Sequence, residues 1–383
     1  MLTILHLINT LDPGGAEMAL IRLVRHPIEN VRHVVVTVAD KGILGDRIES
    51  SNVDIIELKC KRSIHIGRAL LRCLQIATEV KPDIVQTWLY KSDLLGAIIA
   101  KAYGCKLVWG IHNFSLSYEL IGPRGWIIAR ICGFISKWMP TKIITCSINS
   151  IETHREHGYE ISKFVPVPNG YDLNEFKRIP DARKTYCSAM GIPEDAFIFG
   201  CAARWSPVKG YRNLFLAFAG LCSVVEDAYL VIFGPLMTDE NEELMKLVID
   251  CGVDLDRIRL GGYTTAMPEV MSFIDLHVLA SASEAFPNVV AEAMACETPC
   301  IVTDVGDTRI MTGGLGWVIP PSNPIALKLA MTTAMERSKD RHAWEERRKA
   351  CRQRIIVNYG IDAMANNYLS VWNSVATRRH QPC

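Results

Sequence analysis

Two cations stand five residues apart in the segment Ala202-Ala203-Arg204-Trp205-Ser206-Pro207-Val208-Lys209-Gly210. The segment directly follows an apolar run that is typical of a buried strand. At such a turn an arginine and a lysine can together clamp a diphosphate, Arg204 through a fork of N–H donors and Lys209 as a point charge. Two solvated surface cations are the alternative for an isolated pair, and the position at a strand end argues against it.

A pair of carboxylates lies in the segment Ser281–Glu292, which reads Ser-Ala-Ser-Glu-Ala-Phe-Pro-Asn-Val-Val-Ala-Glu. Glu284 is expected in the loop after a strand, and Glu292 about one turn inside a helix that begins near Asn288. Because carboxylates accept hydrogen bonds from vicinal hydroxyls, the pair suits a sugar and a ribose. The N–H groups of Asn288 and Val289 at the helix start suit a phosphate. An acidic first turn that complements the helix dipole is the alternative, but the apolar neighbours of Glu292 predict a buried carboxylate that needs a partner.

Two less specific candidates lie in the first half of the chain. Asp12-Pro13-Gly14-Gly15-Ala16-Glu17 follows the first predicted strand, and the glycine pair Gly14 and Gly15 lets backbone N–H groups approach a phosphate at a helix start. The loop has neither the dinucleotide fingerprint nor the P-loop pattern. His112 follows the apolar run Lys106–Ile111, where it can bind a sugar hydroxyl or handle a proton. A plain strand–turn–helix connection and a structural histidine are the alternatives.

The elements that must position these residues are short apolar runs alternating with longer amphipathic ones. The runs are rich in Val and Ile without alternation, which is typical of parallel strands buried on both faces. In the first half the predicted strands are Leu2–Ile8, His33–Val38, Val53–Leu58, Asp83–Leu89, Lys106–Ile111 and Lys142–Cys146. The predicted helices between them include Ala16–Val24, Ile66–Val80, Asp93–Ala102 and Trp126–Trp138.

The pattern restarts after Phe164–Tyr171, a proline-rich segment that we interpret as an interdomain linker. The predicted strands of the second half are Phe197–Ala203, Tyr229–Phe233, Ile258–Gly261, Leu276–Ala280 and Cys300–Thr303. Two successive β/α series predict an α/β protein with two Rossmann-like, doubly wound lobes that face each other across a cleft. Ligands of such sheets bind beyond the carboxyl ends of the strands, which is where the candidate residues fall.

Composition excludes several classes of protein. The chain has 383 residues, of which 49% are hydrophobic and 22% charged, so a disordered or fibrous chain is excluded. Its 42 Lys and Arg against 41 Asp and Glu argue against a general nucleic-acid binder. The 13 cysteines include no CxxC pair, which predicts a reducing compartment without disulfides or a zinc site. With no signal peptide and no apolar stretch of about 20 residues, a cytoplasmic protein is expected.

Together these motifs resemble glycosyltransferase family 4, the retaining, nucleotide-sugar-dependent branch of the GT-B fold. The resemblance covers nearly the whole chain, and its most specific parts are the Arg204 to Lys209 segment and the glutamate pair. It rests on Gly14-Gly15-Ala16-Glu17, His112, Pro168-Asn169-Gly170-Tyr171-Asp172, Arg204 with Lys209-Gly210, and Glu284 with Glu292-Ala293-Met294. It implies that residues 1–168 form an acceptor-binding lobe, completed by a crossover helix in 360–383, and that 169–359 bind the nucleotide sugar.

The resemblance also implies roles for individual residues. Those at or near the chemistry are His112 and Glu284, which contact the donor sugar, and Arg204 and Lys209, which bind the diphosphate. The remaining donor-binding residues are Gly14, Gly15, Tyr263, Phe286, Pro287, Asn288, Val289 and Glu292, with Glu292 on the ribose and Tyr263 near the base. A core or surface tyrosine is the alternative for Tyr263. The chain departs from the pattern after Asp304-Val305-Gly306, where Asp307-Thr308-Arg309-Ile310 stands in place of an expected Glu.

The expected activity is retaining transfer of a sugar from a nucleotide sugar, with a UDP-sugar as the expected donor, to a saccharide or lipid-linked saccharide of the cell surface. We expect a front-face transfer in which the departing phosphate takes the acceptor's proton. No metal or other cofactor is expected, because Arg204 and Lys209 neutralise the diphosphate and Asp254-Leu255-Asp256 reads as a surface turn. The alternatives are a nucleotide-sugar epimerase of the same fold and a non-catalytic sugar-nucleotide binding protein.

Two windows of the first half are basic and contain no acidic residue, namely 59–72 and 124–142. The second also carries several aromatic and aliphatic residues, among them Trp126, Phe134 and Trp138. Basic and aromatic residues on an apolar helix suit the plane of an anionic membrane, which would place the protein on the inner face of the membrane. A core-packing helix with solvated cations is the alternative.

Overall fold

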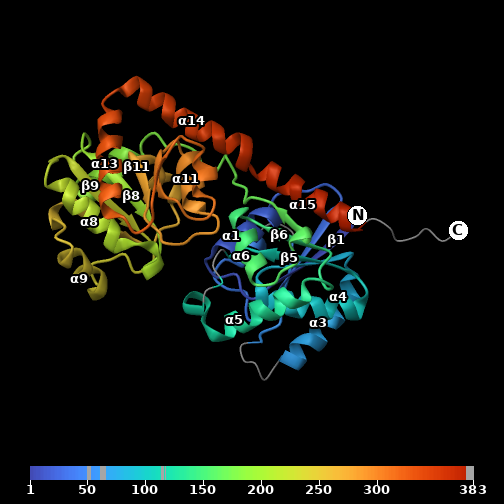
Figure 1. Cartoon of the computed structure of the whole chain (residues 1–383). Coiled ribbons are helices and arrows are strands. Elements are labelled where there is room, and N and C mark those ends of the chain that lie inside the picture. Colours follow the sequence, from blue (N-terminus) through green and yellow to red (C-terminus); the bar gives the residue numbers. More distant parts are fainter. Residues whose placement is uncertain (50–52, 61–65, 114–115, 117, 377–383) are drawn as a thin grey trace. The chain divides into compact units, whose positions relative to one another are not determined.

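The computed structural model describes residues 1–49, 53–60, 66–113, 116 and 118–376, and the chain forms two compact units (Figure 1). Unit 1 comprises Met1–Gly170 and Ile361–Cys383, and unit 2 comprises Tyr171–Gly360. The transitions expected from the sequence, at 168/169 and 359/360, lie two residues and one residue before these boundaries.

Unit 1 contains a parallel sheet in the order β3-β2-β1-β4-β5-β6-β7. The pairing is in register from Leu2 opposite Val31 to Ile8 opposite Thr37, and most residues of these strands are buried, which explains their continuous apolar runs. The strands are β1 (Leu2–Ile8), β2 (Val31–Thr37), β3 (Asp54–Glu57), β4 (Ile84–Thr87), β5 (Lys106–Ile111), β6 (Lys142–Thr145) and β7 (Phe164–Pro166).

Strand β7 corrects the prediction that all of Phe164–Tyr171 is linker. Its three residues pair with β6, with Phe164 opposite Ile143. Proline is tolerated here because β7 is the last strand of the sheet, where Pro166 need not donate to a further neighbour. The turn-rich composition of the segment therefore masked a short edge strand.

Helices of unit 1 cover the sheet and include the C-terminal one. They are α1 (Gly15–Arg25), α2 (Asp46–Glu49), α3 (Ile66–Val80), α4 (Tyr90–Tyr103), α5 (Tyr118–Ile135), α6 (Asn149–Glu156) and α15 (Ile361–Ala376), with a 3₁₀ turn at Ile161–Lys163. Tyr368 and Trp372 of α15 are fully buried in one core with Leu20 of α1 and Ile4 of β1. The predicted return of the final helix to the first lobe is therefore observed within unit 1.

Helix α5 ends three residues before the predicted Trp138. Beyond its end the Lys163 ammonium holds the following turn, because it donates to the carbonyl oxygens of Ser136 at 2.9 Å, Lys137 at 2.7 Å and Pro140 at 2.9 Å. Pro140 also disfavours helical backbone in the residue before it. Within α5, Gly122 has φ 68° and marks a kink beside Pro123.

Unit 2 contains a second parallel sheet in the order β10-β9-β8-β11-β12-β13. Its strands are β8 (Phe197–Ala202), β9 (Ala228–Phe233), β10 (Ile258–Gly262), β11 (Leu276–Leu279), β12 (Cys300–Thr303) and β13 (Trp317–Ile319). Strand β13 was not predicted, because an edge strand of three residues is too short to show a period of its own.

Helices of unit 2 surround this sheet. They are α7 (Ala182–Met190), α8 (Tyr211–Cys222), α9 (Glu242–Asp250), α10 (Met267–Phe273), α11 (Asn288–Ala295), α12 (Thr308–Thr312), α13 (Pro324–Ser338) and α14 (Arg341–Tyr359), with 3₁₀ turns at Pro207–Lys209 and Leu255–Arg257. Asp254 begins the second of these turns by accepting from the Asp256 N–H at 3.0 Å. Among the described helices, none is both long and apolar enough to cross a membrane.

Candidate functional site

The order of the strands in unit 2 brings two predicted segments together. Strands β8 and β11 are neighbours at the point where the strand order reverses, which is where open parallel sheets bind ligands. The loops that follow them are joined by a hydrogen bond from the Ala282 N–H to the Val208 carbonyl at 2.8 Å. Gly210 has φ +70° and a Cβ built there would lie 2.0 Å from the Ala280 carbonyl oxygen, so only glycine permits this approach.

Lys209 and Glu284 meet at this point. The Lys209 Nζ lies 2.6 Å from the Glu284 Oε1, and the Ser281 hydroxyl donates to the same oxygen at 2.7 Å. The side chains are 21% and 14% exposed, so the pair is largely shielded but still accessible. An ammonium that carries three donors and a carboxylate that accepts several hydrogen bonds can bind a phosphate oxygen and a sugar hydroxyl side by side.

Arg204 is held by its backbone while its side chain is exposed. The Tyr211 hydroxyl donates to the Ala203 carbonyl at 2.8 Å, and the Trp205 N–H donates to the Pro235 carbonyl at 3.3 Å. Gly234 permits this packing, because a Cβ there would lie 2.1 Å from the Ala203 carbonyl oxygen. The strand end is therefore rigid, and the guanidinium is free to reach an anion at the edge of the sheet.

Helix α11 begins at Asn288 as predicted, and it buries Glu292 to 8% exposure one turn later. The Tyr171 hydroxyl donates to the Asn288 Oδ1 at 2.6 Å, so the Asn288 side chain is already engaged. Neither this role of Tyr171 nor the contact of Ser281 with Glu284 was predicted. The signal for Ser281 was its position three residues before Glu284.

Phe286 and Pro287 have buried side chains, in contrast to Val289, which is partly exposed. The Phe286 ring packs edge-on against Tyr359 with the centroids 5.8 Å apart. The contribution predicted for Phe286 and Pro287 is therefore confined to their backbone. Tyr263, directly after β10, is exposed and its ring is available to a ligand.

The loop after β12 supports the Glu284 loop. The Asp307 N–H donates to the Ala285 carbonyl at 3.2 Å, and Gly306 lies against the carbonyls of Glu284 and Ala285. The Asp304 carboxylate, near the expected but absent Glu, receives the Arg309 Nη2 at 2.6 Å in an exposed ion pair. This loop lacks the expected Glu, but its contacts with the Glu284 loop still support the candidate site.

In unit 1 the Gly14-Gly15 pair lies at the N-terminus of α1, as predicted. A Cβ on Gly14 would lie 2.2 Å from the Glu17 Oε2, so the Glu17 side chain folds back over the helix start. Burial raises the pKa of Glu17. A hydrogen bond to the Glu17 backbone N–H lowers this pKa, and the nearby Asp12 raises it. A phosphate at this helix start would have to share it with the Glu17 carboxyl group.

His112 follows β5 and stacks on Trp88, with the ring centroids 5.0 Å apart and the planes 19° apart. Both of its ring nitrogens are buried and lack a hydrogen-bond partner among the residues that the structure describes. Burial lowers the pKa of His112 to about 4, so the imidazole is neutral near pH 7. A neutral ring can donate to one hydroxyl and accept from another.

Two family models match the chain, one in each half. The family "Glycosyl transferases group 1" matches residues 183–350, and "Glycosyltransferase Family 4" matches residues 13–175. The Escherichia coli UDP-Gal:alpha-D-GlcNAc-diphosphoundecaprenol alpha-1,3-galactosyltransferase is 23% identical over 77% of this chain and 76% of its own. The Streptomyces fradiae 2-deoxystreptamine N-acetyl-D-glucosaminyltransferase is 21% identical over 84% of this chain and 82% of its own.

Among solved structures, Anabaena Alr3699/HepE in complex with UDP and glucose superposes with a TM-score of 0.85. The superposition covers 98% of this chain and 100% of that one at 21% identity, and it establishes the fold. Two parallel-sheet Rossmann-like units of this kind define the GT-B fold. The chain belongs to the group 1 and family 4 glycosyltransferases.

Proposed function

We propose that this glycosyltransferase uses a UDP-sugar as donor and transfers the sugar with retention to a saccharide or lipid-linked saccharide of the cell surface. The observation that carries the donor site is the Lys209–Glu284 pair beside the start of α11, with Glu292 buried one turn later. Two kinds of relative support the donor and the acceptor. Alr3699/HepE was solved with UDP, and the E. coli relative is named for a UDP-sugar donor and a diphosphoundecaprenol-linked acceptor.

In the proposed mechanism the leaving diphosphate carries the developing charge. Arg204 and Lys209, with the N–H groups at the start of α11, stabilise that charge, and the departing phosphate accepts the acceptor's proton on the same face of the sugar. Glu284 binds sugar hydroxyls, a role that suits a carboxylate already held by Lys209 and Ser281. We propose that these two cations replace a metal ion as the diphosphate ligands.

Nucleotide binding in EDTA tests the donor site. UDP at 100 times its dissociation constant is expected to stabilise the native chain by about 2.7 kcal/mol, which a thermal shift detects readily. Glu292→Ala is expected to lose most of the UDP shift, because the ribose loses its carboxylate partner. Glu336→Ala, which removes an exposed carboxylate paired with Lys339, serves as the control and should keep the shift.

A turnover assay then separates the three candidate activities. A glycosyltransferase releases UDP in proportion to the product formed on an acceptor, whereas an epimerase changes the donor without an acceptor and a binding protein does neither. If no nucleotide stabilises the wild-type chain, the donor site proposed here is wrong.

For the acceptor side we propose peripheral contact with an anionic bilayer on the cytoplasmic face, through an apolar ridge of unit 1. The ridge consists of Ile127, Ile131, Phe134 and Trp138, which share one side of α5 and the following turn and are all exposed. Phe134 and Trp138 are each 64% exposed and pack edge-on with the centroids 5.1 Å apart. An exposed apolar ridge of this kind is typical of an interaction surface.

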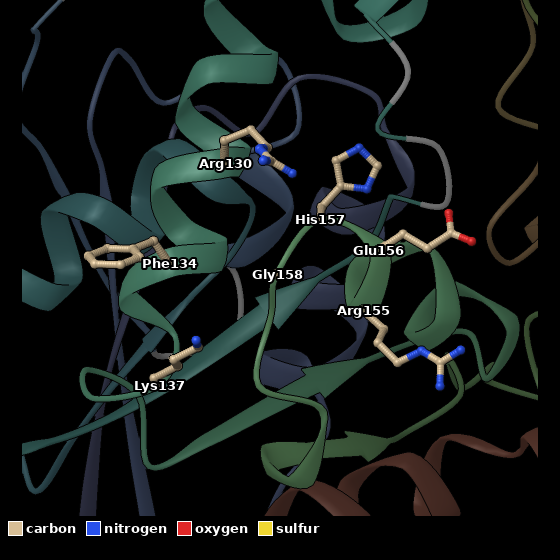
Figure 2. Close-up of a pocket in the computed structure, with 7 residues that line it drawn as sticks. All are labelled: Arg130, Phe134, Lys137, Arg155, Glu156, His157 and Gly158. Atoms are coloured by element: carbon tan, nitrogen blue, oxygen red, sulfur yellow. The ribbon is translucent and has the colours of Figure 1, made fainter.

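Beside the ridge lies a basic pocket of about 350 Å³ (Figure 2). Arg130 and Lys137 come from α5 and the turn after it, and the opposite side is formed by the end of α6. The pocket is lined by Arg130, Phe134, Lys137, Arg155, Glu156, His157 and Gly158. The pocket has three permanent cations, Arg130, Lys137 and Arg155, and one carboxylate. Such an excess of positive charge next to aromatic residues suits the phosphates of an anionic lipid. Of the other predicted window, 59–72, residues 61–65 lie outside the described part of the chain.

Vesicle flotation tests this contact. The full chain is expected to bind phosphatidylglycerol-rich vesicles at low salt, and Phe134→Ser with Trp138→Ser should weaken binding at least tenfold. Arg130→Glu with Lys137→Glu should remove the preference for anionic lipid, because each cation near such a surface contributes about 1 kcal/mol. Ile325→Ser with Leu329→Ser, two exposed apolar residues of α13 in unit 2, is the control. Failure of the wild-type chain to float with anionic vesicles would exclude the contact.

A further inference from the structure

Trp88, directly after β4, is the aromatic centre of a buried cluster in unit 1. Its indole lies nearly parallel to two other rings, His112 at 5.0 Å and 19° and Tyr368 of α15 at 5.9 Å and 17°. Trp88 and Tyr368 are fully buried. Stacked aromatic rings contribute to orientation as well as to burial, so the plane of Trp88 restricts the plane of His112.

A hydrogen-bonded chain holds the indole in turn. The Trp88 Nε1 lies 3.2 Å from the His6 Nδ1, and the His6 Nε2 lies 2.9 Å from the His33 Nδ1. Because an indole N–H can only donate, the His6 Nδ1 must accept, and the His6 Nε2–H therefore donates to His33. Burial lowers the pKa of His6 well below its ordinary value and that of His33 to about 4, so both rings stay neutral in this arrangement near pH 7.

The backbone at the ends of β4 and β5 is equally constrained. The backbone N–H of Trp88 donates to the Leu7 carbonyl, and the backbone N–H of Leu89 donates to the Gly110 carbonyl, each at 2.9 Å. Leu89 has φ 70° and ψ 157°, a conformation that a residue with a side chain adopts only when its surroundings enforce it. Gly110 lies so close to β4 that a Cβ there would be 2.5 Å from the Thr87 carbonyl oxygen.

We infer that Trp88 is a positioning residue of the transfer reaction, which orients the His112 imidazole for the donor sugar and is itself oriented by its hydrogen bond to His6. The inference rests on the proposed function, because it assumes that His112 contacts the sugar. The two His112 nitrogens have no partner among the described residues that could fix the ring. The stacking on Trp88 therefore sets the orientation of the His112 ring. Stacking uses the face of the ring and neither of its nitrogens.

Kinetics of two Trp88 variants test the inference. Trp88→Leu is expected to lower kcat at least tenfold while the dissociation constant of UDP changes less than twofold, because a small misplacement of a catalytic group is costly whereas the proposed UDP site lies in unit 2. Trp88→Phe keeps a ring but loses the N–H, and should fall between wild type and Trp88→Leu. Trp109→Leu is the matched control, since Trp109 is also fully buried, lies on β5 and packs against Tyr159. It should lose stability but keep kcat within twofold.

A double variant distinguishes positioning from general packing. If Trp88 acts through His112, adding Trp88→Leu to His112→Ala should lower kcat by less than twofold beyond His112→Ala alone. A full tenfold further loss, or equal losses of kcat in Trp88→Leu and Trp109→Leu, would overturn the inference.

A titration of His112 by NMR provides a readout that does not depend on activity. Trp88→Leu should raise the pKa of His112 from about 4 toward its ordinary value, because the ring loses its cover, whereas Trp109→Leu should leave it low. If the wild-type chain turns over no nucleotide sugar, the proposed function fails and this titration still tests Trp88. An unchanged His112 titration in Trp88→Leu would overturn the inference in either case.

Discussion

Lys209→Ala is expected to lower kcat by one to three orders of magnitude. The ammonium is proposed to stabilise the leaving diphosphate, and removing one such charge-assisted contact costs about 2–4 kcal/mol of barrier. The structure adds a second effect, since Lys209 lies 2.6 Å from the Glu284 Oε1 and the Glu284 side chain is only 14% exposed. Removing the lysine therefore also leaves a largely shielded carboxylate with less compensation.

These two effects can be separated with one further variant. In Lys209→Ala with Glu284→Gln the uncompensated charge is gone, so thermal stability should recover while turnover stays low. Lys339→Ala is the control, because Lys339 forms an exposed ion pair with Glu336 and should change neither property. Steady-state kinetics with a UDP-sugar measure the turnover of each variant, and thermal unfolding measures its stability. Wild-type turnover in Lys209→Ala would contradict the proposed role.

The architecture of the candidate site follows from a few sequence features. The runs predicted to end at Ala203 and Ala280 read as buried parallel strands, which end at Ala202 and Leu279 in the structure. Motifs placed directly after them had to emerge at the same edge of a sheet. The apolar neighbours of Glu292 predicted its burial, which the structure confirms. Periodicity and turn chemistry were sufficient for these elements because burial on both faces leaves a continuous apolar pattern.

Other features depend on contacts that are distant in sequence. Nothing near Tyr171 indicates that its hydroxyl reaches Asn288, 117 residues later. The stacking of Trp88 on His112 likewise depends on the β4–β5 pairing and on the unusual backbone of Leu89. Edge strands β7 and β13 are only three residues long, so their pairing with a neighbour identifies them better than their own sequence does. Contacts between residues far apart in sequence determine these features, which the local sequence pattern does not predict.

Gly306→Ala is expected to reduce both stability and donor use, with a fall in kcat/KM for the donor of more than tenfold. Gly306 has φ +52°, and a Cβ there would lie 2.1 Å from the Glu284 carbonyl oxygen and 2.6 Å from that of Ala285. The left-handed conformation alone costs an alanine roughly 1–2 kcal/mol. The clash adds to this cost, and because the opposing atoms belong to the backbone of the Glu284 loop, relief requires that loop to move.

Gly314→Ala supplies the matched control for this last prediction. Gly314 has φ +83° in the same unit, but a Cβ there would meet nothing within 4 Å. It should therefore show the conformational cost alone, as a stability loss of roughly 1–2 kcal/mol with unchanged kcat/KM. The difference between the two variants measures how strongly the loop after β12 holds Glu284 in place. Equal kcat/KM values for Gly306→Ala and Gly314→Ala would mean that the Glu284 loop tolerates displacement, and that its hydrogen bonds to Lys209 and Ser281 suffice to position the carboxylate.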